Sequence, residues 1–399
     1  MSKGHISQLK KYHQLISQRV NRLSPSGIRK FFDLLASMEG VISLGVGEPD
    51  YTTPWHIREA AIYSLEKGYT MYTSNSGMPE LRRELSRYLK DSYDLTYDLN
   101  NELLITVGVS EALDLAMRAI LNPGDEVIMP DPSYVAYDSS VILSGGEPVR
   151  VPTNQESHFE ISAAEIEARV TDKTKAILIG YPANPTGAVM PRDKLLEIAE
   201  LVQLHQLLVI SDEIYAKLVY GVGHTCFASL PGTKENTILL GGFSKAYAMT
   251  GWRIGYAAAP REIIAAMTKI HQYTMMCAPT MSQVAAIEAL RAGESSVLEM
   301  VEDYNRRRKV IVKGLNSIGL ACFEPRGAFY AFPSVKVTAM SSEEFAEKLL
   351  TEEKVAVVPG SAFGQCGEGY VRCCYATSMT DIEEALSRMK RFVDKYKVV

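Results

Sequence analysis

The stretch TILLGGFSKAYAMTGWRIGYAAA, residues 237–259, contains two short apolar runs, at 237–240 and 254–259, with glycines and a few polar residues between them. Neither run alternates apolar with polar residues, which is typical of strands covered on both faces of a sheet. Helix-like stretches separate four more runs of this kind, which lie at 103–107, 126–129, 175–179 and 207–210. We therefore predict an α/β fold in which helices cover a large, mostly parallel sheet of about seven strands.

The last third of the chain has a different pattern. A long, charged helical pattern at 282–318 precedes a predicted helix at 342–351 and strand-like runs at 328–334, 355–358 and 370–375. This alternation indicates a smaller α+β domain.

The chain length of 399 residues allows two domains. We predict a large domain at 48–285 and a small domain at 286–399, with 1–47 forming an N-terminal arm and part of the small domain. Within this segment, 24–44 is expected to pack with the small domain. Residues 1 to about 20 are expected to form an arm that is either flexible or wraps around a partner.

The composition argues against several classes of partner. The net charge of −5 is too small to indicate binding to nucleic acid or to an acidic membrane surface. The densest basic run, 306–309, follows acidic residues and is expected to form a solvated helix face. The sequence has no apolar signal segment and no membrane-spanning stretch, and its six cysteines form no C-x-x-C pair, so we expect a cytoplasmic protein with reduced thiols.

Glycines and polar residues follow the apolar runs, where open α/β sheets bind their ligands. Gly108-Val109-Ser110 could cradle a phosphate at the start of a helix, or Ser110 could be an ordinary helix cap. Asp212 could likewise be only a cap, 184–187 (Asn-Pro-Thr-Gly) only a turn, and Lys245 only a lysine with a half-buried stem. The functional interpretation rests on all four lying in order at successive strand ends.

The set G-V-S, N-P-T-G, S-D-E-I-Y and S-K-A-Y-A-M-T-G-W-R-I-G-Y resembles the class I/II aminotransferases of the aspartate-aminotransferase fold (fold type I). It is most similar to their bacterial and archaeal aromatic and aspartate branches. The resemblance runs from about Ser24 to the C-terminus and includes LGVGEPD at 44–50 and Tyr370-Val371-Arg372. It implies a pyridoxal 5'-phosphate-dependent aminotransferase that transfers an amino group from an amino acid to a 2-oxo acid in a ping-pong mechanism.

The resemblance also implies roles for individual residues. Lys245 would form the Schiff base with the cofactor and then carry protons, and Asp212 would keep the pyridine nitrogen protonated. Tyr215 and Asn184 would hydrogen-bond the phenolic oxygen of the ring. Tyr134 would stack on the ring, although a half-buried core tyrosine is the alternative.

The cofactor phosphate would lie against the amides of Val109 and Ser110, near Ser244 and Arg253. One departure from the family pattern is Gly242, because many relatives have serine three residues before the lysine. This difference puts one hydroxyl contact to the phosphate in doubt.

Tyr72 resembles the tyrosine that reaches the phosphate from the other subunit, which implies a homodimer with shared active sites. Arg372 would bind the substrate α-carboxylate, near Asn184 and the Gly47 backbone, with a surface ion pair as the alternative. The aromatic residues within 327–332, together with Tyr72, favour aromatic or broadly apolar substrates, but they could equally be core packing.

Two other classes of function remain open from the sequence. A C–S β-lyase on the same fold would use the same cofactor to eliminate a leaving group. A non-catalytic effector-binding module would need a DNA-binding domain, for which about 23 preceding residues are too few. The seven histidines lack the spacing of metal ligands, so we expect no metal site.

Overall fold

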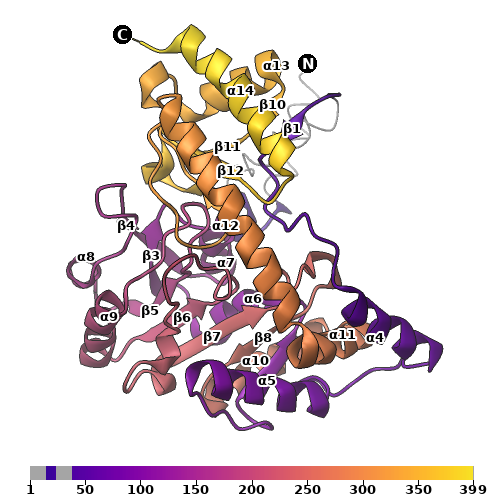
Figure 1. Cartoon of the computed structure of the whole chain (residues 1–399). Helices are drawn as coiled ribbons and strands as arrows, with labels where there is room; N and C mark the ends of the chain where they lie inside the picture. Colours follow the sequence, from indigo (N-terminus) through magenta and orange to yellow (C-terminus); the bar gives the residue numbers. More distant parts are fainter. Residues whose placement is uncertain (1–14, 24–37, 399) are drawn as a thin grey trace.

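The computed structural model describes residues 15–23 and 38–398, and its largest feature is a seven-stranded sheet (Figure 1). The strand order is β2-β8-β7-β6-β5-β3-β4, and β8 alone is antiparallel to its neighbours. The α/β fold with a mostly parallel seven-stranded sheet is thus confirmed. The strands are β2 (Leu103–Thr106), β3 (Glu126–Asp131), β4 (Glu147–Pro152), β5 (Thr174–Ile179), β6 (Leu208–Asp212), β7 (Thr237–Gly242) and β8 (Gly255–Ala258).

Six of these strands coincide with the predicted apolar runs, whereas β4 was not predicted. Its sequence, EPVRVP, contains two prolines and an arginine, and most of its residues are only half-buried. β4 lies at the edge of the sheet and pairs with β3 alone. An edge strand tolerates proline and polar residues because one of its sides makes no ladder, so its sequence lacks the apolar run of a central strand.

Helices cover both faces of this sheet because alternate strand residues point to opposite sides. Leu104 and Leu240 face a core shared with α6 and α10, whereas the adjacent Ile105 and Leu239 face a core shared with α4, α5 and α11. The surrounding helices are α4 (Trp55–Glu66), α5 (Pro79–Tyr93), α6 (Gly108–Ile120), α7 (Ala136–Leu143), α8 (Ala163–Glu167), α9 (Arg192–His205), α10 (Arg261–Thr274) and α11 (Thr280–Ala292).

A second, smaller part of the molecule stands at one end of the large sheet (Figure 1). It contains an antiparallel sheet of β11 (Val358–Pro359), β12 (Val371–Cys374) and β9 (Tyr330–Ala331), and a parallel pair of β1 (Ile42–Ser43) and β10 (Val355–Ala356). Its helices are α12 (Glu294–Ser317), α13 (Ser342–Glu353) and α14 (Met379–Tyr396).

The N-terminal residues are described only in part. Residues 42–43 pack in the smaller part, as predicted for segment 24–44, whereas 24–37 lie outside the described residues. The predicted arm is described only from residue 15, and its short helix α2 (Gln18–Asn21) lies near α7 of the same chain. Next to this helix, Arg22 Nη2 lies 2.5 Å from Glu147 Oε2.

The helical pattern predicted at 282–318 is wrong at one point, because Gly293 divides it into α11 and α12. A Cβ at Gly293 would lie 2.5 Å from the carbonyl oxygen of Ala289, so the chain changes direction where only glycine fits. The expected solvated face at 306–309 is also wrong in part. The Arg306 side chain is 64% exposed, but those of Arg307 and Arg308 are 10% and 7% exposed and lie in ion pairs.

Candidate active site

The candidate site lies at the carboxyl end of the large sheet, beside the smaller part of the molecule. β6 ends at Asp212, and Asn184 follows β5. Lys245 follows β7, in an irregular segment rather than in a helix. Arg372 enters from β12 of the smaller part. The carboxyl ends of parallel strands share one edge of the sheet, which is why these distant residues converge.

Lys245 is largely enclosed by neutral groups. Its Nζ donates to the Gly47 carbonyl oxygen at 2.6 Å and lies 5.9 Å and 5.8 Å from the ring centroids of Tyr215 and Phe329. Burial lowers the pKa of this amine from 10.5 to about 8, with a smaller lowering from the charge of Arg372. A substantial fraction of Lys245 is therefore a neutral amine, the nucleophilic form, near pH 8.

Asp212 is a buried carboxyl group with two hydrogen-bond donors. The Tyr137 hydroxyl donates to its Oδ2 at 2.9 Å, and the Ile214 amide donates to its Oδ1 at 3.2 Å. Burial nevertheless raises the pKa of Asp212 from 3.8 to about 6, and the Tyr137 hydrogen bond only partly opposes this rise. The carboxylate thus lacks full compensation and would be stabilised by a nearby cation.

Four tyrosines lie around these groups, in two contacting pairs. The Tyr215 hydroxyl is 2.7 Å from the Tyr330 hydroxyl, and both side chains are buried. Tyr134 packs edge-on against Tyr137, with ring centroids 5.6 Å apart. The pKa of Tyr134 is raised by burial and by Asp212 and is lowered by Arg372 and Arg253, so this ring is within electrostatic reach of all three charges.

Arg372 is buried and held in a fixed orientation. Its Nη1 donates to Asn184 Oδ1 at 2.9 Å and its Nη2 donates to the Gly45 carbonyl oxygen at 2.7 Å. The guanidinium lies 4.5 Å from the ring centroid of Tyr330 and 5.0 Å from that of Phe363. Its Nε is buried and has no hydrogen-bond partner in the described part of the chain. A buried donor without a partner is costly, and an incoming carboxylate would satisfy it.

The start of α6 forms an anion-binding corner. Gly108 has φ +75°, and a Cβ there would lie 2.6 Å from Nη2 of Arg253, so the guanidinium packs directly on this glycine. Arg253 is exposed and uses its Nη1 to donate to the Thr250 carbonyl oxygen at 2.9 Å. Val109 is half-buried and Ser110 is exposed at the same helix start. Unpaired helix amides beside an arginine favour a phosphate or another anion.

Gly242 and Ser244 lie close to this corner. A Cβ at Gly242 would lie 3.0 Å from Cγ2 of Val109 and 3.3 Å from Cδ1 of Ile214. The glycine found where many relatives have serine therefore fits a tight contact with the first turn of α6. Ser244 is buried immediately after β7.

Tyr72 is the one predicted site residue that the described contacts do not connect to the others. Its side chain is 80% exposed on the segment between α4 and α5. Most of the remaining predicted residues are joined by the contacts described above, and Ser110 and Ser244 are placed by their positions at the start of α6 and immediately after β7. Tyr72 faces solvent within a single chain.

Sequence reasoning missed the roles of Tyr137 and Tyr330 and of the Gly45 carbonyl. Tyr137 is the second residue of α7. No local sequence pattern indicated that its hydroxyl would reach Asp212. Tyr330 belongs to the aromatic stretch 327–332. From the sequence, this stretch could line a substrate pocket or could pack in the core. The structure divides this stretch, since Tyr330 contacts Tyr215 and Arg372 whereas Phe332 stacks on Tyr370 in the core.

Comparison with known proteins places the chain among enzymes with this architecture. The family profile of class I and II aminotransferases matches residues 39–389. An aspartate aminotransferase of Pyrococcus abyssi (strain GE5 / Orsay) is 47% identical over 386 residues, which cover 96% of this chain and 99% of that protein. An aromatic-amino-acid aminotransferase 2 of Thermococcus litoralis is 46% identical over 387 residues, which cover 96% of this chain and 100% of that protein.

A solved structure is similar over nearly the whole fold. The aromatic aminotransferase from Pyrococcus horikoshii OT3 superposes with a TM-score of 0.88 at 46% sequence identity, covering 92% of this chain and 99% of that chain. The aspartate and aromatic relatives are almost equally similar to this chain, so overall identity does not separate these two substrate classes.

Proposed function

This chain belongs to the class I and II aminotransferases, and from that membership we propose which of its residues perform the transfer and which substrates they accept. Enzymes of this kind use pyridoxal 5'-phosphate, so the protein is a pyridoxal-phosphate-dependent aminotransferase. It moves an amino group from an L-amino acid to a 2-oxo acid by a ping-pong mechanism. The relatives reported above are aminotransferases, which favours transamination over C–S β-elimination.

The residues present fit this cofactor. A buried amine with a pKa of about 8 and a buried carboxyl with a pKa of about 6 lie at one sheet edge. The anion corner at Gly108 is formed by helix amides and Arg253. We propose that Lys245 attaches the cofactor, that Asp212 faces its ring nitrogen, and that Val109, Ser110, Ser244 and Arg253 hold its phosphate.

Bound pyridoxal phosphate supplies an aldehyde that takes up and returns the amino group, and a ring that accepts the electrons left when the substrate α-proton is removed. In our proposal, the neutral amine of Lys245 removes the α-proton of the substrate. It then carries this proton to the carbon that belonged to the cofactor aldehyde. Asp212 would remain a carboxylate, because the protonated ring nitrogen of the cofactor would offset the cost of burying its negative charge. Tyr134 would cover one face of the ring, and Tyr215 and Asn184 would donate to its phenolic oxygen.

Arg372 is proposed to hold the α-carboxylate of every substrate. The observation that carries this role is the buried, unpartnered Nε on a guanidinium whose plane is fixed by Tyr330 and Phe363. Since Asn184 and Gly45 already orient the other two nitrogens, little side-chain entropy is lost when a carboxylate binds. The backbone of Gly47 lies beside the same guanidinium group.

We propose L-amino acids with aromatic or apolar side chains as the preferred donors, with aspartate as the second candidate and 2-oxoglutarate as acceptor. In the described part of the chain, the cations with the largest influence on the titratable groups of the site are Lys245, Arg253 and Arg372. Each of these three cations already has a proposed role. None of them is therefore assigned to bind the side-chain carboxylate of an acidic substrate such as aspartate. The aromatic rings of Tyr330 and Phe363 support the preference for apolar donors.

We propose a homodimer in which Tyr72 reaches the phosphate corner of the partner. An exposed apolar surface supports it, since large side chains of α4, the segment after α4 and the end of α10 are solvent-exposed in one chain. Hydrogen bonds from Asn75 to Met276 and from Thr280 to Met71 join these segments into one surface. The exposed residues are Trp55, Ile62, Tyr63, Leu65, Tyr69, Met71, Tyr72, Tyr273, Met275 and Met276.

The division into a large domain at 48–285 and a small domain at 286–399 with part of 1–47 is also a proposal. The separate sheets support it, and the interruption between α11 and α12 at Gly293 lies a few residues after the proposed boundary. In residues 15–23 and 38–398, no helix has the length and apolarity needed to cross a bilayer. We propose a cytoplasmic enzyme without a membrane or nucleic-acid partner, on the basis of the mild net charge.

The experiment that tests this function is stopped-flow absorbance of the yellow holoenzyme mixed separately with phenylalanine, tyrosine, aspartate, alanine and cystathionine. Conversion of the aldehyde form of the cofactor to its amine form, reversed by 2-oxoglutarate, is the expected result, with the aromatic donors fastest. Release of pyruvate and ammonia from cystathionine, without an amine form, would instead identify a β-lyase.

A further inference from the structure

The segment 44–50 joins the smaller part of the molecule to the large sheet and lies across the candidate site. Its backbone contacts β12 and two candidate site residues: the Leu44 carbonyl oxygen accepts from the Cys374 amide at 2.7 Å, that of Gly45 from Arg372 at 2.7 Å and that of Gly47 from Lys245 at 2.6 Å. A Cβ at Gly47 would lie 2.6 Å from the Tyr330 hydroxyl oxygen. The position of this backbone therefore fixes the geometry around both Lys245 and Arg372.

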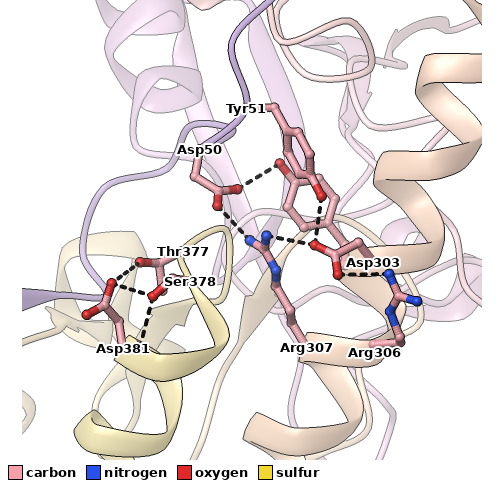
Figure 2. Close-up of polar contacts among 9 residues, drawn as sticks. Asp50, Tyr51, Asp303, Arg306, Arg307, Thr377, Ser378 and Asp381 are labelled. Carbon is pink, nitrogen blue, oxygen red and sulfur yellow. Dashed lines mark hydrogen bonds and ion pairs between the residues drawn. The ribbon is translucent and has the colours of Figure 1, made fainter.

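At the end of this segment, Asp50 and the following residue, Tyr51, bind α12 (Figure 2). Asp50 Oδ2 accepts from Arg307 Nη1 at 2.8 Å, and Asp303 Oδ2 lies 2.7 Å from Arg307 Nη2 and accepts from the Tyr51 hydroxyl at 2.7 Å. The guanidinium lies 5.6 Å and 5.5 Å from the ring centroids of Tyr51 and Tyr304. We call Asp50, Tyr51, Asp303 and Arg307 the α12 clamp.

The burial of the clamp distinguishes it from an ordinary surface ion pair. The Arg307 side chain is 10% exposed, and those of Asp303 and Asp50 are 20% and 29% exposed. The neighbouring Arg306 is 64% exposed and also contacts Asp303. Buried, mutually oriented charges couple more strongly than exposed ones, for which the contribution is small.

Nearby polar groups do not compete with Asp50 for Arg307. Figure 2 also draws Asp381, at the start of α14, with no dashed line to a clamp residue. Its carboxylate accepts from Ser378 Oγ at 2.7 Å and from Thr377 Oγ1 at 3.4 Å, which are contacts within its own helix start. Asp50 is therefore the carboxylate outside α12 that Arg307 binds.

A second route connects the clamp to the site through packed rings. Tyr304 lies 5.6 Å from Phe329, centroid to centroid, and Phe329 lies 5.0 Å from Tyr330. Tyr330 in turn lies under the Arg372 guanidinium. Because close-packed rings move together, a displacement at Arg307 would be felt at Arg372 by two routes.

We propose that Asp50 and Arg307 are positioning residues, which hold segment 44–50 so that Gly45 and Gly47 orient Arg372 and Lys245 for substrate carboxylate binding. This inference rests on the proposed role of Arg372. When the clamp is broken, the segment occupies its binding-competent position only part of the time. Apparent affinity falls in proportion to the competent fraction, so a fraction of about one tenth weakens carboxylate binding about tenfold.

The test compares Arg307→Gln, Asp50→Ala and their double variant with the control Arg306→Gln, all as holoenzymes. Calorimetry measures binding of 3-phenylpropionate and of succinate, carboxylates that have no amino group to transfer. Each single clamp variant is expected to bind about tenfold more weakly, and the double variant about as weakly as the weaker single, because both singles break the same Asp50–Arg307 ion pair. Arg306→Gln is expected to bind within about twofold of wild type.

The kinetic signature separates positioning from general damage. KM for the amino donor is expected to rise about tenfold in Arg307→Gln, with kcat and the cofactor absorbance nearly unchanged. Arg307→Lys, which keeps one charge opposite Asp50, is expected to recover part of the loss. Should Arg307→Gln fold poorly, Asp50→Ala provides the same comparison at a more exposed position.

Hydrogen–deuterium exchange of the peptide containing residues 44–53 provides a readout that does not depend on catalysis. Faster exchange is expected in Arg307→Gln and not in Arg306→Gln. Equal exchange and equal carboxylate affinity in these two variants would overturn the proposal. If wild type binds neither carboxylate and converts no donor, the proposed function fails instead, and the exchange experiment still decides whether the clamp holds the segment.

Discussion

Replacing Asp212 with asparagine is expected to stabilise the cofactor-free protein at neutral and alkaline pH while abolishing transamination. Asp212 is fully enclosed and is satisfied only by the Tyr137 hydroxyl and the Ile214 amide. An asparagine can keep both contacts, with its oxygen facing the amide and its NH2 group facing the tyrosine oxygen. The substitution therefore removes the buried negative charge with little change in shape.

The magnitude follows from the pKa of Asp212, which burial raises from 3.8 to about 6. The rise of about 2 pKa units corresponds to about 3 kcal/mol of folding free energy. Because the folded pKa exceeds the unfolded one, the carboxyl contributes its full stability only while protonated, below about pH 4. That contribution is lost as the pH rises through about 6.

The assay is thermal unfolding of the cofactor-free wild type and Asp212→Asn proteins between pH 5 and pH 8. The advantage of the variant should increase with pH and then level off above about pH 7. For a chain of 399 residues, unfolding entropy of about 2.1 cal/mol/K per residue converts the full difference to about 3 to 4 °C. Asp172→Asn, which changes an exposed aspartate, is the control and should show no such trend.

Two outcomes would contradict this reasoning. The variant could be no more stable than wild type at pH 8, or its advantage could grow as the pH falls. Either result would mean that burial does not dominate the ionisation of Asp212. Adding pyridoxal phosphate should reverse the order, since a protonated ring nitrogen compensates the carboxylate in wild type and has no charged partner in the variant.

Three further predictions concern the amine, the carboxylate site and the phosphate corner. Since burial lowers the pKa of Lys245 to about 8, covalent uptake of pyridoxal phosphate by the cofactor-free protein should accelerate about tenfold per pH unit below that value and level off above it, as followed by absorbance. Lys245→Ala should bind the cofactor without the covalent absorbance band and without turnover. Arg372→Gln should weaken donor binding by about 2–5 kcal/mol, at least about thirtyfold in KM, with cofactor absorbance unchanged; an unchanged KM would refute the role of Arg372. Gly108→Ala should weaken cofactor binding because its Cβ meets Arg253, whereas Gly124→Ala, which has φ +89° and no atom within 4 Å, should cost a similar backbone strain of about 1–2 kcal/mol and leave cofactor affinity intact. Equal cofactor dissociation constants for these two glycine variants, measured by fluorescence titration, would refute the contact with Arg253.

The sequence was sufficient to predict the large sheet and the convergence of the residues at its edge. Strands covered by helices on both faces are apolar on both faces, so six of the seven were visible as uninterrupted runs. Because parallel strands end at a common edge, the order of Asn184, Asp212 and Lys245 along the chain predicted their proximity in space. The strand-like run at 370–375 likewise contains β12, in which the adjacent Cys373 and Cys374 are both buried.

The features that could not be predicted depend on contacts between distant segments. Tyr137 reaches Asp212 across 75 residues, and Tyr330 reaches Tyr215 across 115. The arginine run of α12 appeared solvated because its nearest acidic neighbours in sequence, Glu302 and Asp303, lie on the same helix, whereas Asp50 lies 257 residues from Arg307. Helical periodicity also continues through Gly293, so only the contacts of that glycine reveal where one helix ends.

The internal hydrogen bonds of Arg372 and Lys245 have a consequence for the enzyme in a crowded cell. Chloride, bicarbonate and inorganic phosphate are abundant, and an open pair of cationic side chains would collect them as inhibitors. Here the side-chain oxygen of Asn184 and the carbonyl oxygens of Gly45 and Gly47 already bind those cations, so a weak anion gains little by entering. A ligand that also has an amino group and a fitting side chain makes enough additional contacts to replace these internal hydrogen bonds. The arrangement thus disfavours binding of small inorganic anions without requiring a lid over the site.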